Sequence, residues 1–157
     1  MRARWYLTLF ILAVTVPSAF PQSVSPVIQE VKGSTVKPAK GQFTITNLSV
    51  TPLTVTLETR SLDLKKNGDV QLLPLDAKVT VKLSEYSFRI PAKADHIVYF
   101  ESACNRCVFS IYSSMVTGRT PQGLQIAIHL PETVYQCADS AKKCRAKIRR
   151  EQFGLPE

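Results

Sequence analysis

The sequence predicts an all-β fold, a sandwich or barrel built from short strands. Apolar and polar residues alternate in most segments after residue 23, turn-forming clusters separate these segments, and no helical pattern of useful length precedes residue 138. A strand turns successive side chains to opposite faces, so alternating segments bury one face and expose the other. Strands at short, fairly regular spacing are typical of an all-β sandwich or barrel.

The first residues have the pattern of a secretory signal peptide. Two arginines precede an apolar run from Tyr6 to Val16, and small residues follow at Ser18 and Ala19. The run is short for a bilayer span, which needs ~20 apolar residues. We therefore expect residues 1–22 to be a signal peptide, and an uncleaved anchor is the alternative.

Residues 23–136 are expected to form one domain. Val24 to Val36 should give a first strand broken near Gly33, as a switch between sheets requires, and the apolar run His96 to Phe100 suits a buried strand. The other strands are expected at 43–45, 53–57, 79–83, 108–112 and 124–130, with turns at 47–52, 66–69, 91–95 and 118–123 and a turn glycine at Gly41. The core should include Phe43, Ile45, Val55, Leu57, Val98, Phe100, Phe109 and Ile111.

The last of these strands carries four large apolar residues of one parity. They are Leu124, Ile126, Ile128 and Leu130, in the stretch GLQIAIHL. One side of the strand is therefore lined by apolar side chains. These apolar side chains could pack against the domain's own core or against another chain, and the sequence leaves both possibilities open.

Residues 137–157 differ in kind from the domain. This basic segment holds six Lys and Arg against three Asp and Glu, a net charge of +3. Asp139 or Ser140 could cap a short helix there, and Gly154 could end it. We favour a solvated basic tail over a surface helix pinned by a disulfide. The formal net charge of +8 is spread over the chain, and the export signal argues against a nucleic-acid partner.

Four cysteines favour disulfides in an exported chain. The pairs Cys104–Cys107 and Cys137–Cys144 are favoured because each is close in sequence, and a crossed pairing is the rival. A four-cysteine zinc site is disfavoured, since six residues separate the second pair where two to four are usual. The C-x-x-C could also serve a thiol–disulfide enzyme, but it lies between two apparent strands where such an enzyme has a helix start.

Outside the C-x-x-C, the sequence gives no sign of catalysis. His96 and His129 lack a companion ligand at metal spacing, and the motifs of hydrolases and phosphate-binding loops do not occur. We expect a protein that is not an enzyme and holds no cofactor or metal.

The stretch GLQIAIHL and several segments before it resemble a known family. Gly123 to Ile128 is similar to the V-L-Q-I-A-[ILV] pattern in the last strand of the first immunoglobulin-like domain of PapD-type periplasmic chaperones of fimbrial assembly. The family's second and third strands are similar to FTITNLSVTPLTVTLE, the stretch leading into its fifth strand to SFRIPAKADHIVYF, and its sixth strand to VFSIYSS. The likeness covers roughly residues 24–136. It implies a single immunoglobulin-like β-sandwich of about seven strands.

The resemblance also implies donor-strand complementation. In that mechanism the chaperone's last strand adds to an incomplete subunit, so Leu124, Ile126, Ile128 and Leu130 are the expected partner-binding residues. The expected function is a periplasmic chaperone-like module for pilin-like or other extracellular subunits, and self-association through the same strand is a further outcome. A structural or adhesion component of a surface assembly and a C-x-x-C oxidoreductase are the alternatives.

Three features depart from the family. The family has a second domain, whereas this chain ends about 20 residues after the candidate strand. The family holds a subunit's terminal carboxylate with an arginine on the first strand and a lysine on the last. Here the first strand region has Lys32 but no arginine, and Thr133, beside Pro131 and Glu132, stands at the position of the lysine. The flanking cysteines are not part of its pattern. The carboxylate clamp is therefore not expected here.

Overall fold

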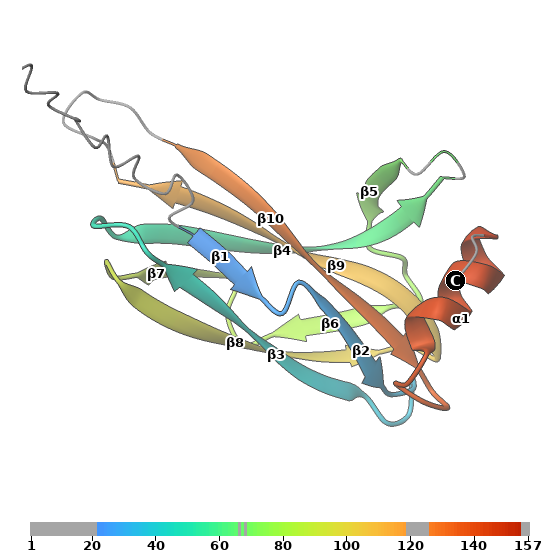
Figure 1. Ribbon diagram of the computed structural model, residues 1–157. Coiled ribbons are helices and arrows are strands. Elements are labelled where there is room, and N and C mark those ends of the chain that lie inside the picture. The colour runs from blue at the N-terminus through green and yellow to red at the C-terminus, as the bar shows by residue number, and fades with distance from the viewer. Residues whose placement is uncertain (1–21, 66, 68, 119–125, 155–157) are drawn as a thin grey trace, which may run out of the picture.

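Two β-sheets pack face to face in the computed structural model, which describes residues 22–65, 67, 69–118 and 126–154 (Figure 1). Sheet A has the strand order β1-β3-β8-β6, and sheet B has the order β2-β10-β9-β4-β5 with β7 also paired to β4. The all-β sandwich that the sequence predicts is confirmed. The elements are β1 (Gln22–Ser25), β2 (Ile28–Lys32), β3 (Ala39–Asn47), β4 (Leu53–Leu64), β5 (Val70–Pro74), β6 (Thr80–Leu83), β7 (Ser87–Ile90), β8 (Ala94–Ala103), β9 (Arg106–Thr117), β10 (Ala127–Cys137) and α1 (Cys144–Phe153).

The strands number ten among the described residues, where the sequence predicts about seven. The first strand is two separate strands, β1 and β2, and the strands β5 and β7 were not predicted. All five residues of β5 are exposed, so its sequence has no buried parity for a pattern to detect. β5 and β7 exist because the long strand β4 offers them a partner edge.

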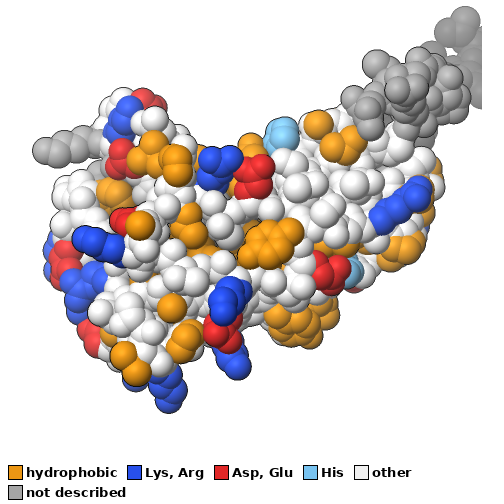
Figure 2. Space-filling model, turned by 180° about the vertical axis from the view of Figure 1, so that it is seen from behind, with side chains coloured by type: hydrophobic (Ala, Val, Ile, Leu, Met, Phe, Trp, Pro, Cys, Tyr) orange, Lys and Arg blue, Asp and Glu red, His pale blue; other side chains and the backbone are white. Residues whose placement is uncertain are grey.

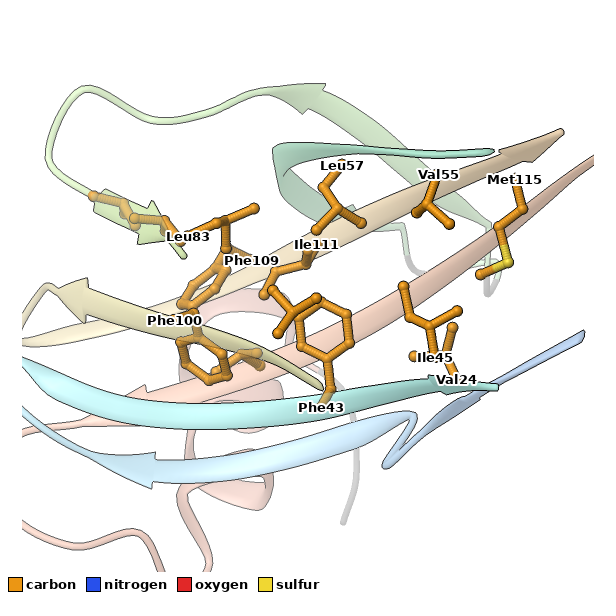
Figure 3. Packing of buried hydrophobic residues seen from close by; sticks show 14 of the residues in the cluster. Val24, Phe43, Ile45, Val55, Leu57, Leu83, Phe100, Phe109, Ile111 and Met115 are labelled. Atoms are coloured by element: carbon orange, nitrogen blue, oxygen red, sulfur yellow. The ribbon is translucent and has the colours of Figure 1, made fainter. Parts of the chain in front are cut away.

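The core lies between the two sheets. Phe43 of sheet A reaches toward sheet B, and the rings of Phe100 and Phe109 meet edge to face with centroids 6.2 Å apart (Figure 3). All eight residues that the sequence assigns to the core are buried in this one cluster, which confirms that prediction. Edge-to-face aromatic pairs and close packing of this kind give a core much of its stability.

The expectation for β8 was wrong in one respect. The run at 96–100 is apolar throughout, but Ile97 and Tyr99 are 44% and 55% exposed while Val98 and Phe100 are buried. No described element covers the outer face of sheet A, so every second side chain of β8 meets solvent. The continuous apolar run at 96–100 therefore belongs to a strand that is buried on one face only.

The first strand does change sheets, at Pro26 and not at Gly33. β1 ends at Ser25 and β2 begins at Ile28, so the proline lies in the break, where its missing N–H costs no ladder bond. Gly33 follows the end of β2, and a Cβ on it would lie 2.5 Å from the backbone nitrogen of Ala39. Gly41 is inside β3 and not at a turn.

The basic segment after β10 folds into a helix, so the solvated tail that we favoured from the sequence is wrong. Cys144 and Ile148 of α1 are buried and form a second cluster with Val108, Tyr135 and Cys137 on the outer face of sheet B. The helix begins after Lys143, which has a positive φ of 63°, and not at the predicted caps. Its end at Gly154 agrees with the prediction.

The charged side chains form no single continuous patch on the face shown in Figure 2, where basic and acidic groups are mixed. Ion pairs join α1 to its surroundings, Lys147 to Asp139 and Arg106 to Glu151. No helix among the described residues is long and apolar enough to cross a membrane. The predicted signal peptide lies outside the described residues, apart from Gln22 in β1.

Replacing Ile148 with alanine should destabilise the protein by about 2–5 kcal/mol, because its buried side chain holds α1 on sheet B. Urea unfolding and hydrogen exchange of α1 measure this effect. Val36→Ala is the matched control, since Val36 is 91% exposed and should be neutral. A neutral Ile148→Ala would show that α1 does not dock in solution.

Candidate functional site: the open edge of the last strand

β10 is paired along its whole length on one side and along only half on the other. β9 pairs with it from Ala127 to Cys137, whereas β2 pairs only with Thr133 to Cys137. The reason is the change of sheets at Pro26, because β1 pairs with β3 and leaves β10. Among the described strands none pairs with this side of residues 127–132, and we call it the open edge (Figure 1, where β10 is orange and β1 and β2 are blue).

The direction of the backbone groups at the open edge follows from neighbouring bonds. Thr133 N–H donates to the Val27 carbonyl at 2.8 Å, and the Cys137 carbonyl accepts from Gly33 N–H at 3.1 Å. The backbone N–H and C=O groups of odd-numbered residues of β10 therefore point toward β2. By the same alternation, residues 127, 129 and 131 point out of the open edge. Position 131 is proline, so this edge offers two N–H donors and three carbonyl acceptors to an added strand.

The apolar row predicted from the sequence lies along this edge on the interior face of β10. Ile126 is 53% exposed, Ile128 and Leu130 are half-buried, and Leu130 packs against the core. Leu124 lies outside the described residues. The domain's own second layer therefore covers the row only in part, with cover that decreases toward the start of the strand. We call Ile126, Ile128, Leu130 and the next residue of this parity, Glu132, the inner row.

Glu132 is fully buried at the point where β2 begins to pair with β10. Its Oε1 accepts a hydrogen bond from the Gln29 amide of β2, and its Oε2 has no partner. The same Gln29 nitrogen also donates to the carbonyl of Gln42 at 2.8 Å, so it joins the two sheets. Burial raises the pKa of Glu132 to about 8, and the bond from Gln29 opposes this rise. The carboxyl is therefore mostly protonated at neutral pH.

Sequence reasoning treated Glu132 only as an unsuitable anchor. One signal could have found it, because this charged residue stands between two apolar residues of the same parity, Leu130 and Val134. Alternation alone does not say whether such a residue is buried, since that depends on how far β2 extends along β10.

The outer face of β10 carries His129, which is held in place by β9. Its Nδ1 lies 2.9 Å from the Ser114 hydroxyl, and its ring stacks on Tyr112 with centroids 5.4 Å apart. His96 lies in sheet A, 3.0 Å from Glu85 and stacked on Phe88. The two histidines are thus apart, and the described residues contain no group of three potential ligands that could hold a metal ion.

The cysteines pair in the way that the sequence favours. Cys104 bonds Cys107 across the turn between β8 and β9, with Cα atoms 6.2 Å apart, and Cys137 bonds Cys144 to join β10 to α1, with Cα atoms 5.8 Å apart. Neither member of the C-x-x-C lies at a helix start, and no cysteine of the described residues is free. This arrangement is that of structural bridges, and it does not support thiol–disulfide catalysis.

Solved structures with the same fold are PapD-like domains. The chain is similar to the class 5 fimbriae chaperone CfaA (TM-score 0.58, 11% identity, 76% of this chain and 57% of that chain). It is similar to a chain of the CsuC–CsuE chaperone–tip adhesion subunit complex from Csu pili of Acinetobacter baumannii (TM-score 0.53, 11% identity, 80% and 65%). It is also similar to PapD-like domain 7 of human CEP192 (TM-score 0.50, 9% identity, 87% and 97%).

These likenesses establish an immunoglobulin-like sandwich of PapD type. The chain spans between half and two thirds of the length of the chaperones that it matches, and nearly the whole of the CEP192 domain. No protein-family model matches the chain, and no curated protein matches it in sequence. One fold thus serves proteins of different roles, so function has to be argued from the site.

Replacing Glu132 with glutamine should remove a pH dependence of stability. The folded state holds the proton up to pH about 8, whereas an unfolded glutamate loses it near pH ~4.3. The folded state therefore binds more protons than the unfolded state between these two pH values. As the pH rises through this window, the wild-type free energy of unfolding should fall, relative to that of Glu132→Gln, by up to about 1.4 kcal/mol per pH unit. Urea unfolding of both proteins between pH 5 and 8 measures the difference. Parallel pH profiles would contradict the raised pKa.

Proposed function

We propose that this protein is a periplasmic chaperone-like binding protein for subunits of fimbriae or other surface assemblies. It binds by adding the open edge of β10 to an incomplete sheet of the subunit. The observation that carries the proposal is that the open edge coincides with the half-covered apolar row. A second feature supports it, the likeness in fold to chaperones of fimbriae and pili.

The open edge can supply both parts of strand addition. Its outward backbone groups give main-chain hydrogen bonds to a new strand, and its alternate side chains give selectivity. Burying a whole Leu or Ile contributes ~1.5–3 kcal/mol, and Ile126 alone still has half of its surface to bury. Pro131 limits how far a foreign strand can pair, which is a usual protection for an exposed edge.

The predicted export signal and the disulfides both suit an oxidising compartment. Both bridges are closed in the structure, and bridges of this kind persist in the periplasm and outside the cell. Together with the predicted signal peptide, they support a periplasmic site of action.

The proposed mechanism differs from the family's in its anchor. The implied family mechanism binds a subunit's carboxylate with basic residues of the first and last strands. Here the pair that joins these two strands at the end of the open edge is Gln29 and Glu132. Neither an amide nor a protonated acid supplies the positive charge of that clamp, so we propose that affinity comes from the open edge and its inner row.

Replacing Ile126 and Ile128 together with serine should abolish co-purification of the partner from periplasmic extract. The domain should stay folded, because Ile126 is 53% exposed and Ile128 is half-buried. Ile97→Ser is the matched control, since Ile97 is a similarly exposed isoleucine of sheet A, 44% exposed, and should leave capture unchanged. Circular dichroism and mass spectrometry of the captured proteins are the readouts.

The outcomes separate the candidate functions. Capture of pilin-like subunits that depends on both isoleucines supports the chaperone. Unfolding of the double variant would place the inner row in the protein's own core and contradict the proposal. Recovery of a second copy of the chain alone would instead indicate self-association through the same edge.

A further inference from the structure

The inner row is apolar until its last member, which is an acid. Glu132 closes the row where β2 starts to pair, and no part of its surface is exposed. An added strand on the open edge would end beside it, because β2 occupies the next position along β10. The partner residue that meets Glu132 would therefore come from the end of the partner strand that lies next to β2.

The carboxyl of Glu132 is incompletely bonded. Among the described residues Gln29 is its one hydrogen-bond partner, and the nitrogen of that amide already bonds both Oε1 and the carbonyl of Gln42. Oε2 is buried without a partner. A buried polar atom in this condition costs free energy that a matching group can recover. A cationic donor recovers most, because bonds between charged groups are the strongest and the apolar surroundings screen them little.

We propose that Glu132 is a binding site for a lysine or arginine side chain on the partner segment that adds to the open edge. This inference rests on the proposed function, since it assumes strand addition there. It names the partner's chemistry: an extended segment of alternating apolar residues with one basic residue at the end that meets Glu132. The apolar positions give affinity, and the basic residue fixes the register of the segment along the edge.

Binding of a cation to Glu132 is coupled to loss of a proton. Burial raises the pKa of Glu132 to about 8, so in the free protein the acid is mostly neutral below this pH. An ammonium or guanidinium at Oε2 stabilises the carboxylate, so binding releases a proton. Affinity for a basic segment should then rise with pH between 6 and 8, by up to about tenfold per unit.

Neighbouring strands place two groups beside Glu132. From β2 comes the Gln29 amide, and from β9 comes the apolar Ile111, which lies opposite Glu132 in the ladder. No charged group contributes to the shifted pKa. The histidine of β10, His129, lies on the other face of the strand with Ser114 and Tyr112. A Glu132 variant therefore isolates the acid's share of any pH dependence.

The test uses the full mature protein and synthetic peptides as probes. Each peptide has nine residues of alternating leucine and serine with blocked ends, and one leucine is replaced in turn by lysine or by norleucine. Calorimetry at pH 6.5 and 8.0, in buffers of different ionisation enthalpy, gives affinity and protons released. Wild type, Glu132→Gln and Glu132→Leu are compared after their folding has been checked by circular dichroism.

At one lysine position we expect binding to the wild type to be at least about tenfold tighter than that of the norleucine peptide at pH 8.0. About one proton should be released at pH 6.5, and both effects should vanish in the two variants. Equal binding of lysine and norleucine peptides at every position, or a lysine preference that survives in the variants, overturns this inference and leaves strand addition standing. Failure of every peptide to bind contradicts strand addition itself, and the inference with it.

Discussion

The structure depends on one constraint: a single N-terminal segment has to serve both sheets. β1 completes sheet A beside β3, and β2 completes sheet B beside β10, with Pro26 in the break between them. Each sheet therefore receives half a strand. The half that β10 lacks is the open edge, and the decreasing cover of Ile126, Ile128 and Leu130 follows from it. A fully paired β10 would have no open edge.

The two ends of the sandwich are built differently. At the end away from the open edge, Gln136 accepts from Ser102 at 2.5 Å and donates to the Cys104 carbonyl at 2.8 Å, so polar bonds join the sheets. Both disulfides and the docked helix α1 lie at that end as well. The closed end holds the register of β10, which keeps its free half in an extended form that a partner strand can meet without a large entropic cost.

A buried acid beside an apolar row conflicts with stability taken alone. Burial of Glu132 leaves one oxygen unbonded and favours the protonated form, whereas a leucine would pack there without either cost. Such local conflicts are expected where a protein binds something. The likeness to chaperones and to a CEP192 domain extends to the fold, so a role for this chain has to be argued from Glu132 and the residues beside it.

The sequence by itself determined what depends on near neighbours. Alternation placed Phe43 and Ile45 in the core, and short separations favoured the disulfide pairs that the structure contains. Tertiary structure decided what covers each face. It left Tyr99 of β8 exposed, docked Ile148 on sheet B and buried Glu132 beside an edge that is paired for only half its length. The period of side chains along a strand is a local property of the backbone, whereas their cover comes from segments far apart in the chain.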